Sequence, residues 1–143
     1  MTDSTDGGRV NCQDEQRTTI LRAYLALWDA SPSCARAYTA RCLAGCSWLQ
    51  ISEDMDIRYD YVGHLISRAH LYLTARQQGI PIDGGLERTA SRVKERLPDI
   101  RHRRSLAWTI DTALRAMLQE HAIDAMKLDD ATYREEQIHP LCG

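Results

Sequence analysis

The sequence contains no phenylalanine, only two lysines and no long hydrophobic run. A membrane span needs about 20 consecutive apolar residues, so membrane insertion is excluded. Residues 1–8 also lack the basic start and apolar stretch of a secretory signal. The sequence therefore predicts a cytoplasmic protein whose core is built from leucine, isoleucine, alanine, tryptophan and tyrosine.

Recognisable catalytic and metal-binding patterns are also missing. The five histidines are scattered, and no glycine-rich phosphate loop or CxxC motif is present. Cys42 and Cys46 are one helical turn apart and Cys34 precedes them, but no pattern completes a four-ligand set. Unpaired cysteines are commonly buried as small hydrophobic residues. We therefore expect core packing for these cysteines, no catalytic residues, no metal, no cofactor and no enzymatic activity.

The net charge of −2 excludes a uniformly basic protein that would coat nucleic acid through charge alone. Positive charge is concentrated in residues 88–104, which hold seven basic and two acidic side chains. Apolar residues make up 43% and charged residues 27% of the 143 positions, which is typical of one globular domain. Nucleic-acid binding would therefore depend on local charge.

Apolar spacing of three and four residues predicts an all-α fold with a helix-turn-helix followed by a C-terminal helical hairpin. One clear stripe consists of Val62, Ile66, Ala69 and Leu73. Ser31 and Ser47 are predicted helix caps, and Asp56 is expected in a turn. The expected organisation is a flexible acidic tail (1–16), a helix-turn-helix domain (17–76), a linker (77–85), a helical hairpin (86–127) and an acidic tail (128–143).

The segment around residues 30–76 carries the most specific signal. Eight residues follow a recognisable spacing, namely Gly45, Ser47, Ile51, Met55, Ile57, Val62, Arg68 and Ala69. In this pattern the segment resembles the helix-turn-helix of sigma factor region 4, especially that of the extracytoplasmic-function class. The resemblance implies a stand-alone region-4-like module of bacterial or phage origin that reads duplex DNA, contacts RNA polymerase, or both.

Burial of the apolar anchors would direct the outer face of the second helix into the major groove. The candidate DNA contacts on that helix are Arg58, Tyr59, Tyr61, His64, Ser67 and Arg68. Further candidates are Arg88, Arg92, Arg96, Arg103 and Arg104, which would either bind the phosphate backbone or form a solvated face that pairs with Asp99, Glu87 or the acidic tails. Charges within residues 41–76 sum to zero, so we expect modest affinity that falls as salt rises.

The leading hypothesis is therefore a sequence-specific DNA-binding transcriptional regulator, and the apolar stripe of residues 106–118 would suit the formation of a homodimer. One alternative is a helical protein-interaction module with a degenerate helix-turn-helix. Another is a DNA packaging protein of the phage small-terminase type, which has a similar plan of helix-turn-helix and helical assembly region. Charge placement discriminates between the first two, because DNA binding requires the basic cluster to lie beside Tyr59 and His64.

Overall fold

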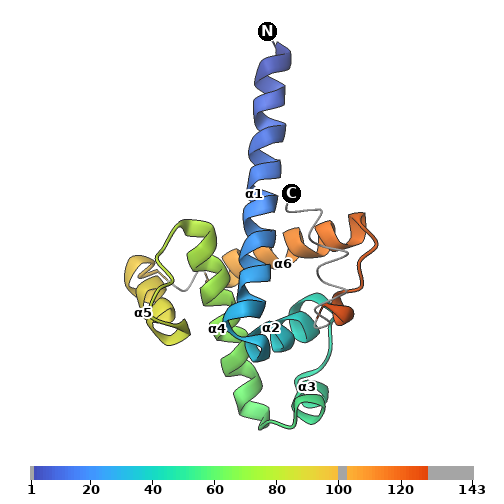
Figure 1. Cartoon of the computed structure of the whole chain (residues 1–143), viewed down its shortest axis with the longest axis vertical. Coiled ribbons are helices and arrows are strands. Elements are labelled where there is room, and N and C mark those ends of the chain that lie inside the picture. The colour runs from blue at the N-terminus through green and yellow to red at the C-terminus, as the bar shows by residue number, and fades with distance from the viewer. Residues whose placement is uncertain (1, 100–102, 129–143) are drawn as a thin grey trace.

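A computed structural model describes residues 2–99 and 103–128, with side chains described from residue 15 onward except at 103 and 104. The helices are α1 (Thr2–Ala30), α2 (Pro32–Tyr38), α3 (Trp48–Met55), α4 (Tyr59–Gln78), α5 (Leu86–Arg96) and α6 (Arg103–Glu120). A π-helical segment, η1 (Thr39–Leu43), continues α2, and a 3₁₀ turn, η3 (Ala125–Lys127), follows α6. Figure 1 shows α4 crossing the molecule between the other helices.

Local capping sets the helix boundaries. The Ser31 side chain accepts a hydrogen bond from the Cys34 amide at 3.2 Å, and Pro32 occupies the first turn of α2. The Ser47 side chain accepts one from the Gln50 amide at 3.1 Å at the start of α3. Both predicted caps are confirmed.

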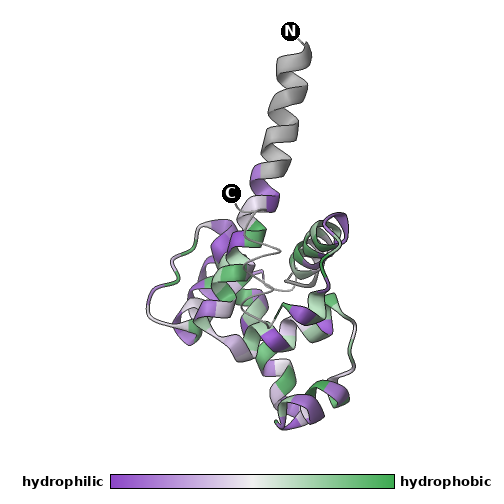
Figure 2. Cartoon of the chain, turned by 45° about the vertical axis from the view of Figure 1, so that its right-hand side comes forward, coloured by the Kyte–Doolittle hydropathy of each residue, from purple (hydrophilic) through white to green (hydrophobic). Residues whose placement is uncertain are grey.

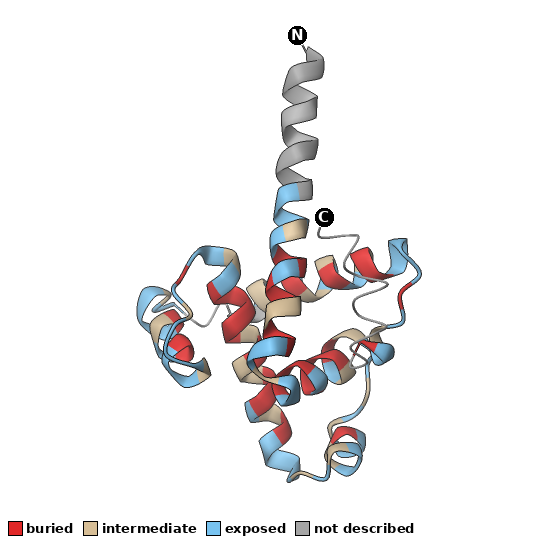
Figure 3. Cartoon of the chain, viewed as in Figure 1, coloured by how far each residue is buried: buried red, intermediate tan, exposed pale blue. Residues whose placement is uncertain are grey.

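The main hydrophobic core combines α1, α2, α4 and α6 with one residue of α3, Ile51. Tyr24, Tyr38, Val62 and Leu114 are completely inaccessible to solvent within it. The predicted stripe of Val62, Ile66, Ala69 and Leu73 is buried on α4. Figure 3 shows buried residues gathered where α1, α2, α4 and α6 come together.

The fold is all-α in the described residues, as predicted. Figure 2 shows hydrophilic and hydrophobic residues intermixed along its helices. Every helix among the described residues is too short or too polar to cross a lipid bilayer.

The predicted C-terminal hairpin is wrong. Helix α5 packs against α4 through a small separate cluster that includes Leu71, Ala90 and Val93, whereas α6 packs against α1, α4 and η1. The two helices have amphipathic stripes of the same period, and such a period does not specify which surface each stripe covers. The stripe predicted for dimerisation is likewise occupied within the chain, because Ile110, Leu114, Met117 and Leu118 are all buried in the main core.

Three predicted boundaries also differ from the structure. The backbone is helical from Thr2, so the first helix begins well before Arg17, where the sequence pattern predicted its start. Helix α4 extends to Gln78 before Gly79 ends it in the left-handed conformation, which shortens the predicted linker to residues 79–85. Leu128 is buried, and the rest of the predicted acidic tail lies outside the described residues.

Candidate functional site

Helices α3 and α4 form a helix-turn-helix held by a short turn. Asp56 adopts the left-handed conformation (φ 53°, ψ 52°), and the Ser52 hydroxyl donates a hydrogen bond to the Ile57 carbonyl at 2.7 Å. The Trp48 ring lies so close to Gly63 that a Cβ atom there would be 2.7 Å from it. The crossing of the two helices is therefore fixed by contacts on both sides of the turn.

The start of α4 presents an exposed face. Figure 1 shows α3 and the first turns of α4 at the lower end of the molecule, away from α1 and α6. The Arg58 side chain is 85% exposed, and Tyr59 and Tyr61 are 55% and 48% exposed. The His64 side chain is 41% exposed and stacks on Tyr61 at a centroid distance of 5.3 Å. Four predicted contact residues thus lie together on accessible surface.

The same surface is acidic. Residues 47–64 contain one arginine against Glu53, Asp54, Asp56 and Asp60, all four of which are exposed. The Arg58 guanidinium forms an ion pair with the Asp60 carboxylate at 3.3 Å. Since DNA phosphates repel carboxylates, this surface would bind DNA only weakly through charge.

Arg68, another predicted contact residue, pairs with Glu87 of α5. Arg68 Nε donates a hydrogen bond to Glu87 Oε1 at 2.8 Å, and His64 Nε2 lies 3.5 Å from the same oxygen. The hydrogen bond from Arg68 lowers the pKa of Glu87 below its usual value. Ser67 is half-buried, and the Arg68 side chain is only 17% exposed. Arg68 can therefore contact DNA only if its pairing with Glu87 changes.

The basic cluster of residues 88–104 is divided by the fold. Arg92 donates hydrogen bonds to the carbonyls of Pro81 and Asp83 at 2.9 and 2.6 Å, so it holds the loop before α5. The Arg92 guanidinium, which was predicted to contact a phosphate, therefore already binds this loop. Arg88 and Arg96 are exposed on α5, whereas the side chains of Arg103 and Arg104 lie outside the described residues. Beside His64 and Arg68 of α4, the charged residue that α5 contributes is the acidic Glu87.

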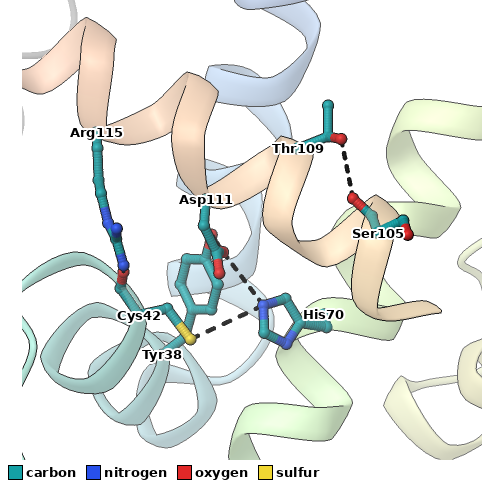
Figure 4. A network of polar contacts seen from close by, with 7 residues as sticks. All are labelled: Tyr38, Cys42, His70, Ser105, Thr109, Asp111 and Arg115. Carbon is teal, nitrogen blue, oxygen red and sulfur yellow. Dashed lines mark hydrogen bonds and ion pairs between the residues drawn. The ribbon is translucent and has the colours of Figure 1, made fainter. Parts of the chain in front are cut away.

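A second polar cluster was not predicted from the sequence. Cys42 of η1, His70 of α4 and Asp111 of α6 place one potential ligand atom each within 4.8 Å of one another (Figure 4). Burial, followed by the Asp111 carboxylate, raises the pKa of the Cys42 thiol to about 12. Cys46, one helical turn from Cys42 in the sequence, lies outside this cluster, with its sulfur 4.0 Å from the Met126 sulfur. No local spacing could have indicated the cluster, because its members come from three separate elements.

Comparison with protein family models, curated proteins and solved structures finds no match to this chain.

Proposed function

We propose that this protein is a DNA-binding transcriptional regulator of bacterial or phage origin that reads duplex DNA with the first turns of α4. The observation that carries the proposal is the exposed group of Arg58, Tyr59, Tyr61 and His64 at the protruding end of a packed helix-turn-helix. An α-helix fits the major groove of B-DNA, and its N-terminal residues are the ones that contact base edges in this motif.

The chemistry of these side chains suits such a contact. Arg58 can donate to acceptor atoms on guanine, and the Tyr59 and Tyr61 hydroxyls can bond to phosphates or bases. Exposed Arg88 and Arg96 on α5 supply additional positive charge. The acidic side chains around the first turns of α4 limit the affinity for DNA, so binding is modest and sensitive to salt.

The test is selection of bound fragments from random duplex DNA with the wild-type protein and with an Arg58→Ala/His64→Ala variant. Each lost base contact reduces the binding free energy by about 1–3 kcal/mol for the selected sequence. Arg76→Ala is the matched control, since Arg76 is exposed on the last turn of the same helix, roughly 25 Å from Arg58. Equal binding by the wild type and the double variant would contradict the proposal.

The exposed apolar side chains favour a second candidate, a docking site for another protein such as RNA polymerase. Leu49 of α3 is 59% exposed, and the ring of its chain neighbour Trp48 lies 5.7 Å from the ring of the exposed Tyr59. Aromatic residues are enriched in protein interfaces, and the surrounding carboxylates would suit a basic partner. In a binding assay with purified RNA polymerase, Leu49→Ala would weaken polymerase binding without changing the sequence of DNA that is selected.

A further inference from the structure

The buried cluster between η1, α4 and α6 contains a thiol, an imidazole and a carboxylate. Cys42 Sγ lies 3.8 Å from His70 Nε2, which in turn lies 3.2 Å from Asp111 Oδ1. Cys42 is 9% exposed, and the side chains of His70 and Asp111 are 14% and 16% exposed. The three groups therefore face one another with little access to bulk water.

The sulfur–nitrogen and nitrogen–oxygen separations are each within about 0.2 Å of those between ligands around one tetrahedral zinc ion. Typical zinc bond lengths give about 3.6 Å between sulfur and nitrogen and about 3.4 Å between nitrogen and oxygen. The same histidine nitrogen faces both the sulfur and the carboxylate, as convergence on a shared ion requires. A nucleophile–base–acid triad would instead use the two different ring nitrogens. Figure 4 shows the three side chains converging in this way.

We propose that Cys42, His70 and Asp111 form a zinc-binding site that joins η1, α4 and α6. Thiolate, imidazole and carboxylate are the ligand types that Zn²⁺ prefers, and the two anionic ligands neutralise the charge of the ion. Binding replaces the thiol proton of Cys42, which leaves to solvent. A water molecule completes the fourth position.

Neighbouring side chains hold the ligands in place. The Tyr38 hydroxyl donates a hydrogen bond to Asp111 Oδ1 at 2.7 Å, and its ring meets His70 edge-on at 5.1 Å. Arg115 of α6 donates to the Cys42 carbonyl through Nε at 2.8 Å and also through a second guanidinium nitrogen. Such outer contacts orient ligands and strengthen metal sites.

The position of the site couples metal binding to the helix-turn-helix. Segment η1 ends at Leu43, four residues before the Ser47 cap of α3, and His70 lies on the same helix as Tyr59 and Tyr61. A bound ion would link the segment that leads into α3, the proposed reading helix and α6. Zinc therefore stabilises the arrangement of these elements, whether the exposed surface at the start of α4 binds DNA or a protein.

The test is titration of the metal-free, full-length protein with Co²⁺, followed by displacement with Zn²⁺. One equivalent of Co²⁺ is expected to give a thiolate-to-cobalt charge-transfer band and the visible bands of a tetrahedral ion, both abolished by Zn²⁺. Cys42→Ser removes the thiolate band. Cys34→Ser leaves it unchanged, because Cys34 is a buried cysteine of α2 outside the cluster.

Two more variants keep the test decisive if Cys42→Ser does not fold, as judged by helical circular dichroism. Asp111→Asn weakens Co²⁺ binding by more than about tenfold while retaining a thiolate band, and Tyr38→Phe weakens it by about tenfold because the carboxylate loses its partner. The absence of a thiolate band in the wild-type protein would overturn the proposal. So would a band that persists in Cys42→Ser and disappears in Cys46→Ser.

Discussion

Glu87 lies at the contact between the proposed reading helix and α5, and its removal should strengthen DNA binding. Its carboxylate accepts a hydrogen bond from Arg68 at 2.8 Å and lies 3.5 Å from His64. Glu87→Gln removes this negative charge and leaves Arg68 able to bind a phosphate. The substitution is conservative in shape, and the Glu87 side chain is 70% exposed, so the fold should be retained.

The size of the effect follows from counterion release. One additional phosphate contact steepens the dependence of log K on log salt by about 0.9. The affinity of the variant relative to the wild type is therefore about 3.5-fold higher at 50 mM salt than at 200 mM salt. The assay is fluorescence anisotropy with a labelled random-sequence duplex over that salt range.

Glu120→Gln is the matched control for this experiment. Glu120 is also an exposed glutamate paired with an arginine, because its carboxylate lies 3.2 Å from Arg17, but it belongs to α6. The net charge change is the same in both variants. An unchanged slope in Glu87→Gln, or an equal change in Glu120→Gln, would refute the inference that the Glu87 carboxylate keeps Arg68 from binding a DNA phosphate.

Three further predictions concern stability and pH. Leu114→Ala lowers the free energy of unfolding, measured by urea denaturation, by about 2–5 kcal/mol, because Leu114 is fully buried in the core. Trp108→Ala on the same helix changes this free energy by less than about 0.5 kcal/mol, since Trp108 is 69% exposed. Equal effects would contradict the placement of α6. Ala122→Gly raises the free energy of unfolding by about 1 kcal/mol, because Ala122 has a φ of 54° that glycine adopts without strain; a loss of stability would contradict this backbone assignment. The Glu87 carboxyl titrates in NMR below the usual glutamate range, and Arg68→Ala raises its midpoint. Because the folded-state pKa of Glu87 is lowered, the stabilisation from its pair with Arg68 is present at neutral pH and is lost as the pH falls through that lowered pKa. An unchanged titration midpoint of Glu87 in Arg68→Ala would exclude this pair in solution.

Features governed by neighbouring residues could be predicted from the sequence. The caps at Ser31 and Ser47, the turn at Asp56 and the apolar stripe of α4 depend on spacings within one or two helical turns. These local signals were sufficient to place a helix-turn-helix and to predict that Arg58, Tyr59 and Tyr61 would be exposed.

Features that depend on tertiary contacts could not be predicted in this way. The sequence places Arg92 on an exposed basic face, but it does not reveal that the carbonyls of Pro81 and Asp83 lie within reach of its guanidinium. For the same reason, spacing shows that α5 and α6 are amphipathic without showing which helix covers which surface. Cys42, His70 and Asp111 come together only when η1, α4 and α6 have packed.

The most direct test of the proposed function is to map the DNA-contacting surface by NMR. Amide chemical shifts of the full-length protein would be recorded at low salt with and without a short random-sequence duplex. The largest changes are predicted at residues 56–64, with smaller changes at the exposed arginines of α5. Changes confined to α1 and α6, or no changes at low salt, would contradict DNA binding by the helix-turn-helix.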